Sequence, residues 1–141
     1  MMRHLVSLVF VVALAACGDP AGPPVVASNI VVTAPAPGMR MAAAYLDITN
    51  RSGTPIRITS VTSPNYESVE MHETTIEDGV ARMRAIPVLE IADGETATFE
   101  RGGKHLMLMR PVDVPDTVTL NFYSDSLLLL SVDTEFTTAT H

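Results

Sequence analysis

Short strand-like segments separated by turn signals fill most of this chain and limit the folds open to it. From residue 29 onward, apolar residues alternate with polar ones or form short apolar runs, and no segment shows a helical period. Residues 56–61 intersperse apolar and polar residues, as a half-buried strand does, and Asp78-Gly79 is typical of a tight hairpin turn. The pattern predicts an all-β fold, an antiparallel β-sandwich of about 100 residues. The expected strands are residues 30–33, 41–49, 56–61, 69–73, 80–86, 88–91, 96–100, 106–110, 117–123 and 127–135.

The N-terminal segment predicts export from the cytoplasm. Arg3 precedes an apolar run over residues 5–16, which has the shape of a signal peptide and is too short to span a membrane stably. The run leads into Leu14-Ala15-Ala16-Cys17, which resembles a bacterial lipobox and holds the single cysteine of the chain. The resemblance implies that residues 1–16 are a lipoprotein signal peptide and that acylated Cys17 anchors the protein in the cell envelope, facing the periplasm. An ordinary signal peptide cleaved near Cys17 is the alternative, and the inner and outer membranes both remain open.

The mature chain is predicted to consist of a tether, one acidic domain and a short tail. Residues 17–28 are rich in Pro and Gly and form the flexible tether, residues 29–136 form the domain, and residues 137–141 form the tail. Without residues 1–16, eight basic and sixteen acidic side chains remain, a formal charge of −8. Phosphate backbones would be repelled by this charge, which excludes nucleic acid as a partner. With one cysteine, no disulfide can form within the chain.

His72, Met83, His105 and Met107 are candidate metal ligands. Imidazole nitrogen and thioether sulfur are borderline or soft donors, and a set of both without a carboxylate suits Cu(I) better than Mg²⁺, Ca²⁺ or Mn²⁺. In a strand, His105 and Met107 would point to one face and Leu106 to the other, toward a core. Taken singly, each candidate has an ordinary explanation as a surface histidine or a core methionine. Only the spacing of all four together indicates a metal site.

The spacing of the four candidates matches a known family. Ten residues separate His72 from Met83, twenty-one separate Met83 from His105, and one separates His105 from Met107. With 8 methionines and 4 histidines in 141 residues, chance would produce this pattern with a probability of about 0.0004. The pattern resembles the H-x10-M-x21-H-x-M motif of the PCuAC family of periplasmic copper chaperones, and the resemblance covers residues 29–136. Neighbouring segments also match, namely Glu77-Asp78-Gly79-Val80, Met83-Arg84 and Gly102-Gly103.

The resemblance implies a cupredoxin-like β-sandwich in which these four residues bind one Cu(I) ion per chain. It also implies a metallochaperone that carries copper to an accepting protein, for assembly of the copper centre of a haem-copper oxidase. The acceptor would be an oxidase subunit or a Sco-type thiol protein. Copper buffering for tolerance, without a dedicated recipient, is the alternative. Many family members have a tail rich in His and Met that holds additional copper, whereas residues 137–141 offer only His141.

Two other functional classes fit the residues poorly. A blue-copper electron carrier needs a Cys thiolate beside two histidines, and Cys17 is far from the candidate ligands in sequence. A zinc hydrolase needs His and carboxylate ligands with a nearby general base, and the sequence contains neither an H-E-x-x-H motif nor a nucleophile elbow. We therefore expect a protein that is not an enzyme.

The other methionines of the mature chain are assigned by their positions. Met71 should face away from His72 and pack in the core. Met109 is expected to fill a gap in the core, with a role as an auxiliary sulfur ligand as the alternative. Met39 and Met41, which flank Arg40 near the second expected strand, either form a methionine-rich rim beside the site or have no role in it.

Overall fold

The computed structural model describes residues 22–35, 37–112 and 116–137. All the regular secondary structure in these ranges is β-strand, as the sequence predicts, and no helix there is long and apolar enough to cross a membrane. Cys17, the signal peptide and His141 lie outside the described residues. In chain order the strands are β1 Val25–Thr33, β2 Met41–Asn50, β3 Ile56–Ile58, β4 Ser60–Thr62, β5 Tyr66–Glu77, β6 Val80–Ala85, β7 Leu89–Ile91, β8 Thr96–Phe99, β9 Lys104–Pro111, β10 Thr117–Ser124 and β11 Leu127–Thr137.

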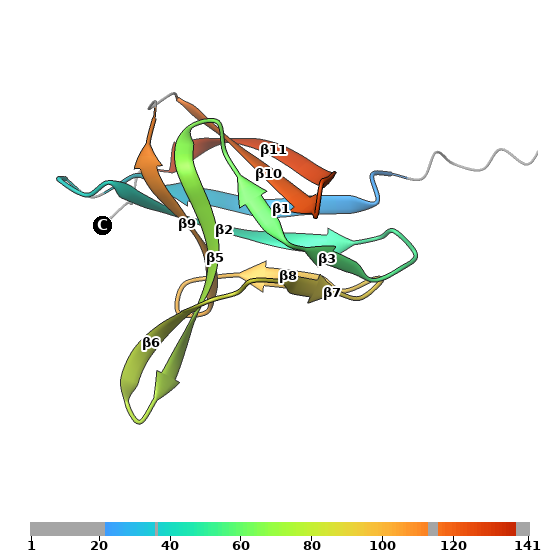
Figure 1. Cartoon of the computed structure of the whole chain (residues 1–141), viewed down its shortest axis with the longest axis horizontal. Coiled ribbons are helices and arrows are strands. Elements are labelled where there is room, and N and C mark those ends of the chain that lie inside the picture. The colour runs from blue at the N-terminus through green and yellow to red at the C-terminus, as the bar shows by residue number, and fades with distance from the viewer. Residues whose placement is uncertain (1–21, 36, 113–115, 138–141) are drawn as a thin grey trace, which may run out of the picture.

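Nine of these strands form one sheet that closes on itself. Eight of them follow the order β1-β11-β10-β4-β5-β9-β2-β8, and the ninth, β6, pairs with β5 off this path. Strand β1 also pairs with β2, which closes the sheet and leaves β8 outside the ring. The pairings are antiparallel except that of β1 with β11, which is parallel. Strands β3 and β7 form a separate two-stranded sheet. Strand β5 runs from the body of the sandwich into a hairpin with β6, and this hairpin projects away from the body (Figure 1).

The core lies inside the closed sheet and is built by strand alternation. In β2 every second side chain from Ala42 to Ile48 is buried, and in β10 the same alternation buries Val118, Leu120 and Phe122. Leu106 and Leu108 of β9 are fully buried, as the sequence predicts for the leucines on either side of Met107. Burying a side chain of this size stabilises the fold by about 1.5–3 kcal/mol, so β9 is held firmly by its inner face.

Several predicted strand boundaries are wrong: β5 was expected over residues 69–73 but spans Tyr66–Glu77, and two other differences follow from strand pairing. Residues 56–61 were expected to form one strand, but Thr59 separates β3 from β4, because β3 pairs with β7 while β4 pairs with β10 and β5. The Thr59 N–H donates instead to the carbonyl oxygen of Tyr123, at 2.8 Å. Strand β1 begins at Val25, within the segment expected to be a tether, because Val25 is buried and pairs with Asn50.

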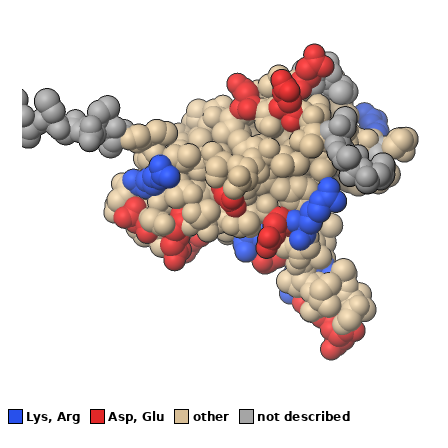
Figure 2. All heavy atoms as spheres, turned by 180° about the vertical axis from the view of Figure 1, so that it is seen from behind, with Lys and Arg blue, Asp and Glu red and all other residues tan. Residues whose placement is uncertain are grey.

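Charged side chains are spread over the surface of the body and the hairpin. On the face that Figure 2 shows, acidic and basic side chains of the described residues are interspersed, and the basic ones form no continuous patch. Several are paired, among them Arg82 and Arg84 of β6, which both contact Glu77 of β5. By strand alternation these pairs lie on the face of the hairpin opposite to Met83.

Candidate metal centre

Strands β5 and β9 place three of the four candidate ligands on one face. The two strands are antiparallel neighbours, and their register sets His72 opposite His105 and Glu70 opposite Met107. Because side chains alternate along a strand, His72, His105 and Met107 share the outer face. Met71 and Leu106, the opposed pair one residue along, point into the core, where both are buried. The predicted core position of Met71 is thus confirmed.

The fourth candidate, Met83, comes from β6. The loop between β5 and β6 consists of Asp78 and Gly79, both with positive φ (52° and 77°), as a type I′ hairpin turn requires. This turn fixes a register in which Met83 lies opposite Thr74 and its sulfur lies 3.1 Å from His72 Nδ1. His72 occupies the point where β5 leaves the body, since it pairs with β9 on one side and with β6 on the other. The three strands therefore meet at His72.

The two imidazoles are close enough to share an ion. Their ring centroids are 5.9 Å apart and their planes are nearly perpendicular, at 80°. A ring centroid lies roughly 3 Å from a metal bound at one of its nitrogens, so two rings that share an ion have centroids at most about 6 Å apart. Similarly, a nitrogen and a sulfur bound to one ion are separated by about 3–4 Å, and the contact between His72 and Met83 falls in this range. The donor geometry fits one small soft cation.

The four candidates differ in how firmly they are held. His105 is 8% exposed, and its Nδ1 lies 3.2 Å from the carbonyl oxygen of Gly103. The same carbonyl accepts the Thr74 N–H at 3.0 Å, which ties the turn before β9 to β5. Met83, by contrast, is 52% exposed on the projecting hairpin. One side of the site is thus buried and anchored, and the other is open to solvent.

The site is distinguished by its soft donor atoms, the nitrogens of two histidines and the sulfurs of two methionines. In the described part of the chain, no group of three or more His, Cys, Asp or Glu side chains gathers as metal ligands. The set of two imidazoles and two thioethers matches the preference of Cu(I). Thioethers are poor ligands for Zn²⁺, which selects thiolate, imidazole and carboxylate donors.

One residue of the site, Glu70, was not identified from the sequence. Its Oε2 lies 2.8 Å from His72 Nε2, on the ring edge away from Met83. The signal was available, because Glu70 and His72 are two residues apart in a strand, as are His105 and Met107, and so share a face. The donor set predicted from the sequence contains no carboxylate, and Glu70 lies beside it as a hydrogen-bond partner of His72.

The neighbouring methionines continue the same outer face. Met109 was expected to pack in the core, but it shares the face of Met107, is partly exposed, and lies opposite Met41 of β2 and Ser68 of β5. The prediction is wrong because alternation along β9 assigns the core to Leu106 and Leu108. Met41 is the first residue of β2 and is 39% exposed, and Met39 before it is 53% exposed.

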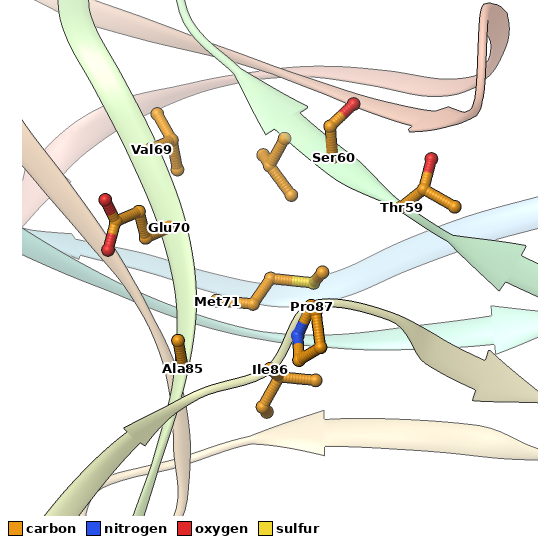
Figure 3. Close-up of a pocket in the computed structure, with 9 residues that line it drawn as sticks. Thr59, Ser60, Val69, Glu70, Met71, Ala85, Ile86 and Pro87 are labelled. Carbon is orange, nitrogen blue, oxygen red and sulfur yellow. The ribbon is translucent and has the colours of Figure 1, made fainter.

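A shallow hollow of about 230 Å³ lies beside the site on the other side of β5. Figure 3 shows Met71 and Pro87 turned into it, whereas the Glu70 carboxylate points away from Met71, across the ribbon of β5. The hollow contains no imidazole. It is lined by Thr59, Ser60, Val61, Val69, Glu70, Met71, Ala85, Ile86 and Pro87.

Solved structures show the same fold. The Cu(I) form of DR1885 from Deinococcus radiodurans is 34% identical, with a TM-score of 0.61 over 87% of this chain and 84% of that one. The metal-free form of DR1885 is 31% identical, with a TM-score of 0.57 over 98% and 94%. A copper-bound PCuAC domain from PmoF2 is 19% identical, with a TM-score of 0.60 over 82% of this chain and 92% of that domain. The expected cupredoxin-like β-sandwich is confirmed.

Sequence comparison identifies the family directly. The model of the family described as "Putative lipoprotein LpqE-like" matches residues 25–126, most of the described domain. No curated protein matches the chain. The resemblance to PCuAC proteins that the motif indicated is confirmed by the structural neighbours. This chain therefore belongs to the LpqE-like family of putative lipoproteins, and its domain has the PCuAC fold.

Proposed function

We propose that this protein is a copper carrier of the bacterial cell envelope that binds one Cu(I) ion through His72, Met83, His105 and Met107. The observation that carries the proposal is the convergence of these four soft donors on one outer face of β5, β6 and β9. The likeness to DR1885, whose structure is known in a Cu(I) form, supports it. The family description as a lipoprotein supports a location in the envelope, anchored at Cys17.

The donor chemistry suits a carrier outside the cytoplasm. Thiolates bind Cu(I) tightly but are oxidised in an oxidising compartment, whereas imidazole and thioether groups are not lost in this way. In this proposal copper is the cargo, and the protein neither changes its oxidation state nor catalyses a reaction. The chain holds the ion on an open face, from which an incoming ligand can take it.

The difference between the two sides of the site gives the order of release. His105 is buried and bonded to the backbone, so it stays in place, while Met83 is exposed on a hairpin that projects from the body. We propose that the Met83 sulfur leaves first and that a thiolate of the acceptor takes its coordination position. The acceptor is then a Sco-type thiol protein or a subunit of a haem-copper oxidase, whose copper centre is the destination.

Copper buffering without a dedicated recipient is the alternative, and genetics separates the two. If the protein delivers copper, deletion of its gene lowers haem-copper oxidase activity at limiting copper, and added copper restores it. If the protein buffers, the deletion strain becomes sensitive to copper while its oxidase activity stays normal. The second outcome contradicts delivery.

Replacement of Met83 by leucine tests the order of release. Leucine nearly preserves the volume, so the fold should be unchanged. Loss of one exposed ligand should weaken Cu(I) binding by about 10-fold, comparable to loss of a supporting contact at a metal site, and should speed release to a dithiol acceptor. Competition with a Cu(I) chelator measures the affinity, and stopped-flow mixing measures the rate. Met39→Leu is the matched control, because Met39 is equally exposed and outside the four-ligand set. Slower transfer from the Met83 variant would contradict this order.

A further inference from the structure

The Glu70 carboxylate contacts His72, although Glu70 is not one of the four candidate ligands. Glu70 Oε2 lies 2.8 Å from His72 Nε2, and the two residues share the outer face of β5. Figure 3 shows the Glu70 side chain on the side of β5 away from Met71, which is the face that carries the candidate ligands. The His72 side chain is only 14% exposed, so its ring is enclosed while it makes this contact.

This contact determines which nitrogen of His72 carries the proton in the neutral ring. An ionised carboxylate only accepts hydrogen bonds, so Nε2 must be the N–H that donates to Glu70. Nδ1 is then unprotonated and has a free lone pair. It is also the nitrogen that lies 3.1 Å from the Met83 sulfur, on the side of the ring where the ion would bind.

His105 is held in the opposite arrangement. Its Nδ1 lies 3.2 Å from the carbonyl oxygen of Gly103, which can only accept, so Nδ1 carries the proton and Nε2 has the free lone pair. The hydrogen bond from Thr74 N–H to the same carbonyl holds that oxygen in place. Each histidine therefore donates one N–H to an oxygen of the protein and keeps its other nitrogen available.

We propose that Glu70 is a positioning residue that fixes His72 in the Nε2–H form, so that His72 binds the ion through Nδ1 while His105 binds it through Nε2. Metal-ligating histidines commonly donate their second N–H to a carboxylate or a backbone carbonyl, which orients the ring and raises its basicity. Here both kinds of support occur in one site, a carboxylate for His72 and a carbonyl for His105. The assignment of the proton concerns the metal-free protein, and only the effect on copper rests on the proposed function.

The tautomers are measured by ¹⁵N NMR on ring-labelled, metal-free protein at about pH 8.5, where a free imidazole is neutral. We expect a protonated Nε2 and an unprotonated Nδ1 for His72 in the wild type, and the reverse for His105. In Glu70→Ala the His72 signals should shift toward a mixture of both forms, while those of His105 stay unchanged. A His72 ring with its proton on Nδ1 in the wild type overturns the proposal.

Copper affinity is the second readout, and Glu73→Ala is the matched control. Glu73 is adjacent to His72 but lies on the opposite face of β5, where it pairs with Lys104 at 3.1 Å. Glu70→Ala should weaken Cu(I) binding by about 10- to 100-fold, the usual cost of losing such a partner, while Glu73→Ala, with the same charge change, should not. Equal losses in both variants overturn the proposal. If the tautomers are as expected but the wild type binds no Cu(I), the proposed function fails and the role of Glu70 in the metal-free site stands.

Discussion

Replacement of His105 by alanine is expected to abolish tight Cu(I) binding, with an affinity loss of more than about 100-fold. Loss of a supporting partner alone costs 10- to 100-fold at metal sites, and this change removes a ligand itself. His105 is the most firmly held of the four donors, since it is buried, bonded to the Gly103 carbonyl and set between the core residue Leu106 and the turn. Its removal leaves three donors for the ion and takes the only imidazole from β9.

The comparison with Met83→Leu separates a lost ligand from general damage. Both variants are titrated with a Cu(I) chelator, and their urea unfolding is measured without copper to verify that each is folded. We expect a loss at least 10-fold greater for His105→Ala than for Met83→Leu, in proportion to how firmly each donor is held. Equal losses, or faster copper transfer from His105→Ala, would show that the site is not divided into an anchored and an open side.

Replacement of Leu106 by alanine is expected to lower the free energy of unfolding by about 2–5 kcal/mol. Leu106 lies between His105 and Met107 but points into the core, where it is fully buried beside Met71. Truncation leaves a cavity that the closed sheet can fill only in part. Since a domain of this size is stable by about 5–15 kcal/mol in total, this single change removes a large share of its stability.

Urea unfolding of the metal-free protein measures this effect, and Leu127→Ala is the control. Leu127 is 65% exposed, so its truncation should change the stability by less than about 0.5 kcal/mol. The ligands of the Leu106 variant lie on the other face and remain, so Cu(I) should still stabilise it, by about 2.7 kcal/mol at a free concentration 100 times the dissociation constant. A loss below about 1 kcal/mol for Leu106→Ala would contradict the assignment of this face of β9 to the core.

Strand alternation made half of the site predictable. His105 and Met107 share a face because they are two residues apart in a strand, and this holds wherever the strand lies in the sheet. That His72 sits opposite His105 depends on the pairing of β5 with β9, across 33 residues of sequence. No local pattern specifies such a pairing or its register. The Asp78-Gly79 hairpin signal indicated that His72 and Met83 lie close together, but only the family motif indicated that they meet His105 and Met107.

The ends of the strands were also harder to predict, because they depend on strand pairing, which the local sequence does not specify. Residues 56–61 were read as one strand, yet the chain changes pairing partners at Thr59, because β3 and β4 belong to different sheets. The two consecutive polar residues Thr59 and Ser60 interrupt the alternation at this point. Val25 looks like part of a Pro/Gly-rich tether until the pairing with Asn50 buries it. Glu70 could have been found, since it follows the same two-residue rule that placed Met107 beside His105.

X-ray absorption at the copper edge on the protein loaded with Cu(I), together with the copper content per chain, tests the four-ligand site most directly. If His72, Met83, His105 and Met107 bind one ion, the shell contains nitrogen at roughly 2.0 Å and sulfur at roughly 2.3 Å in about equal numbers, with one copper per chain. A shell of nitrogen and oxygen alone, or two or more ions per chain, would contradict the four-ligand site.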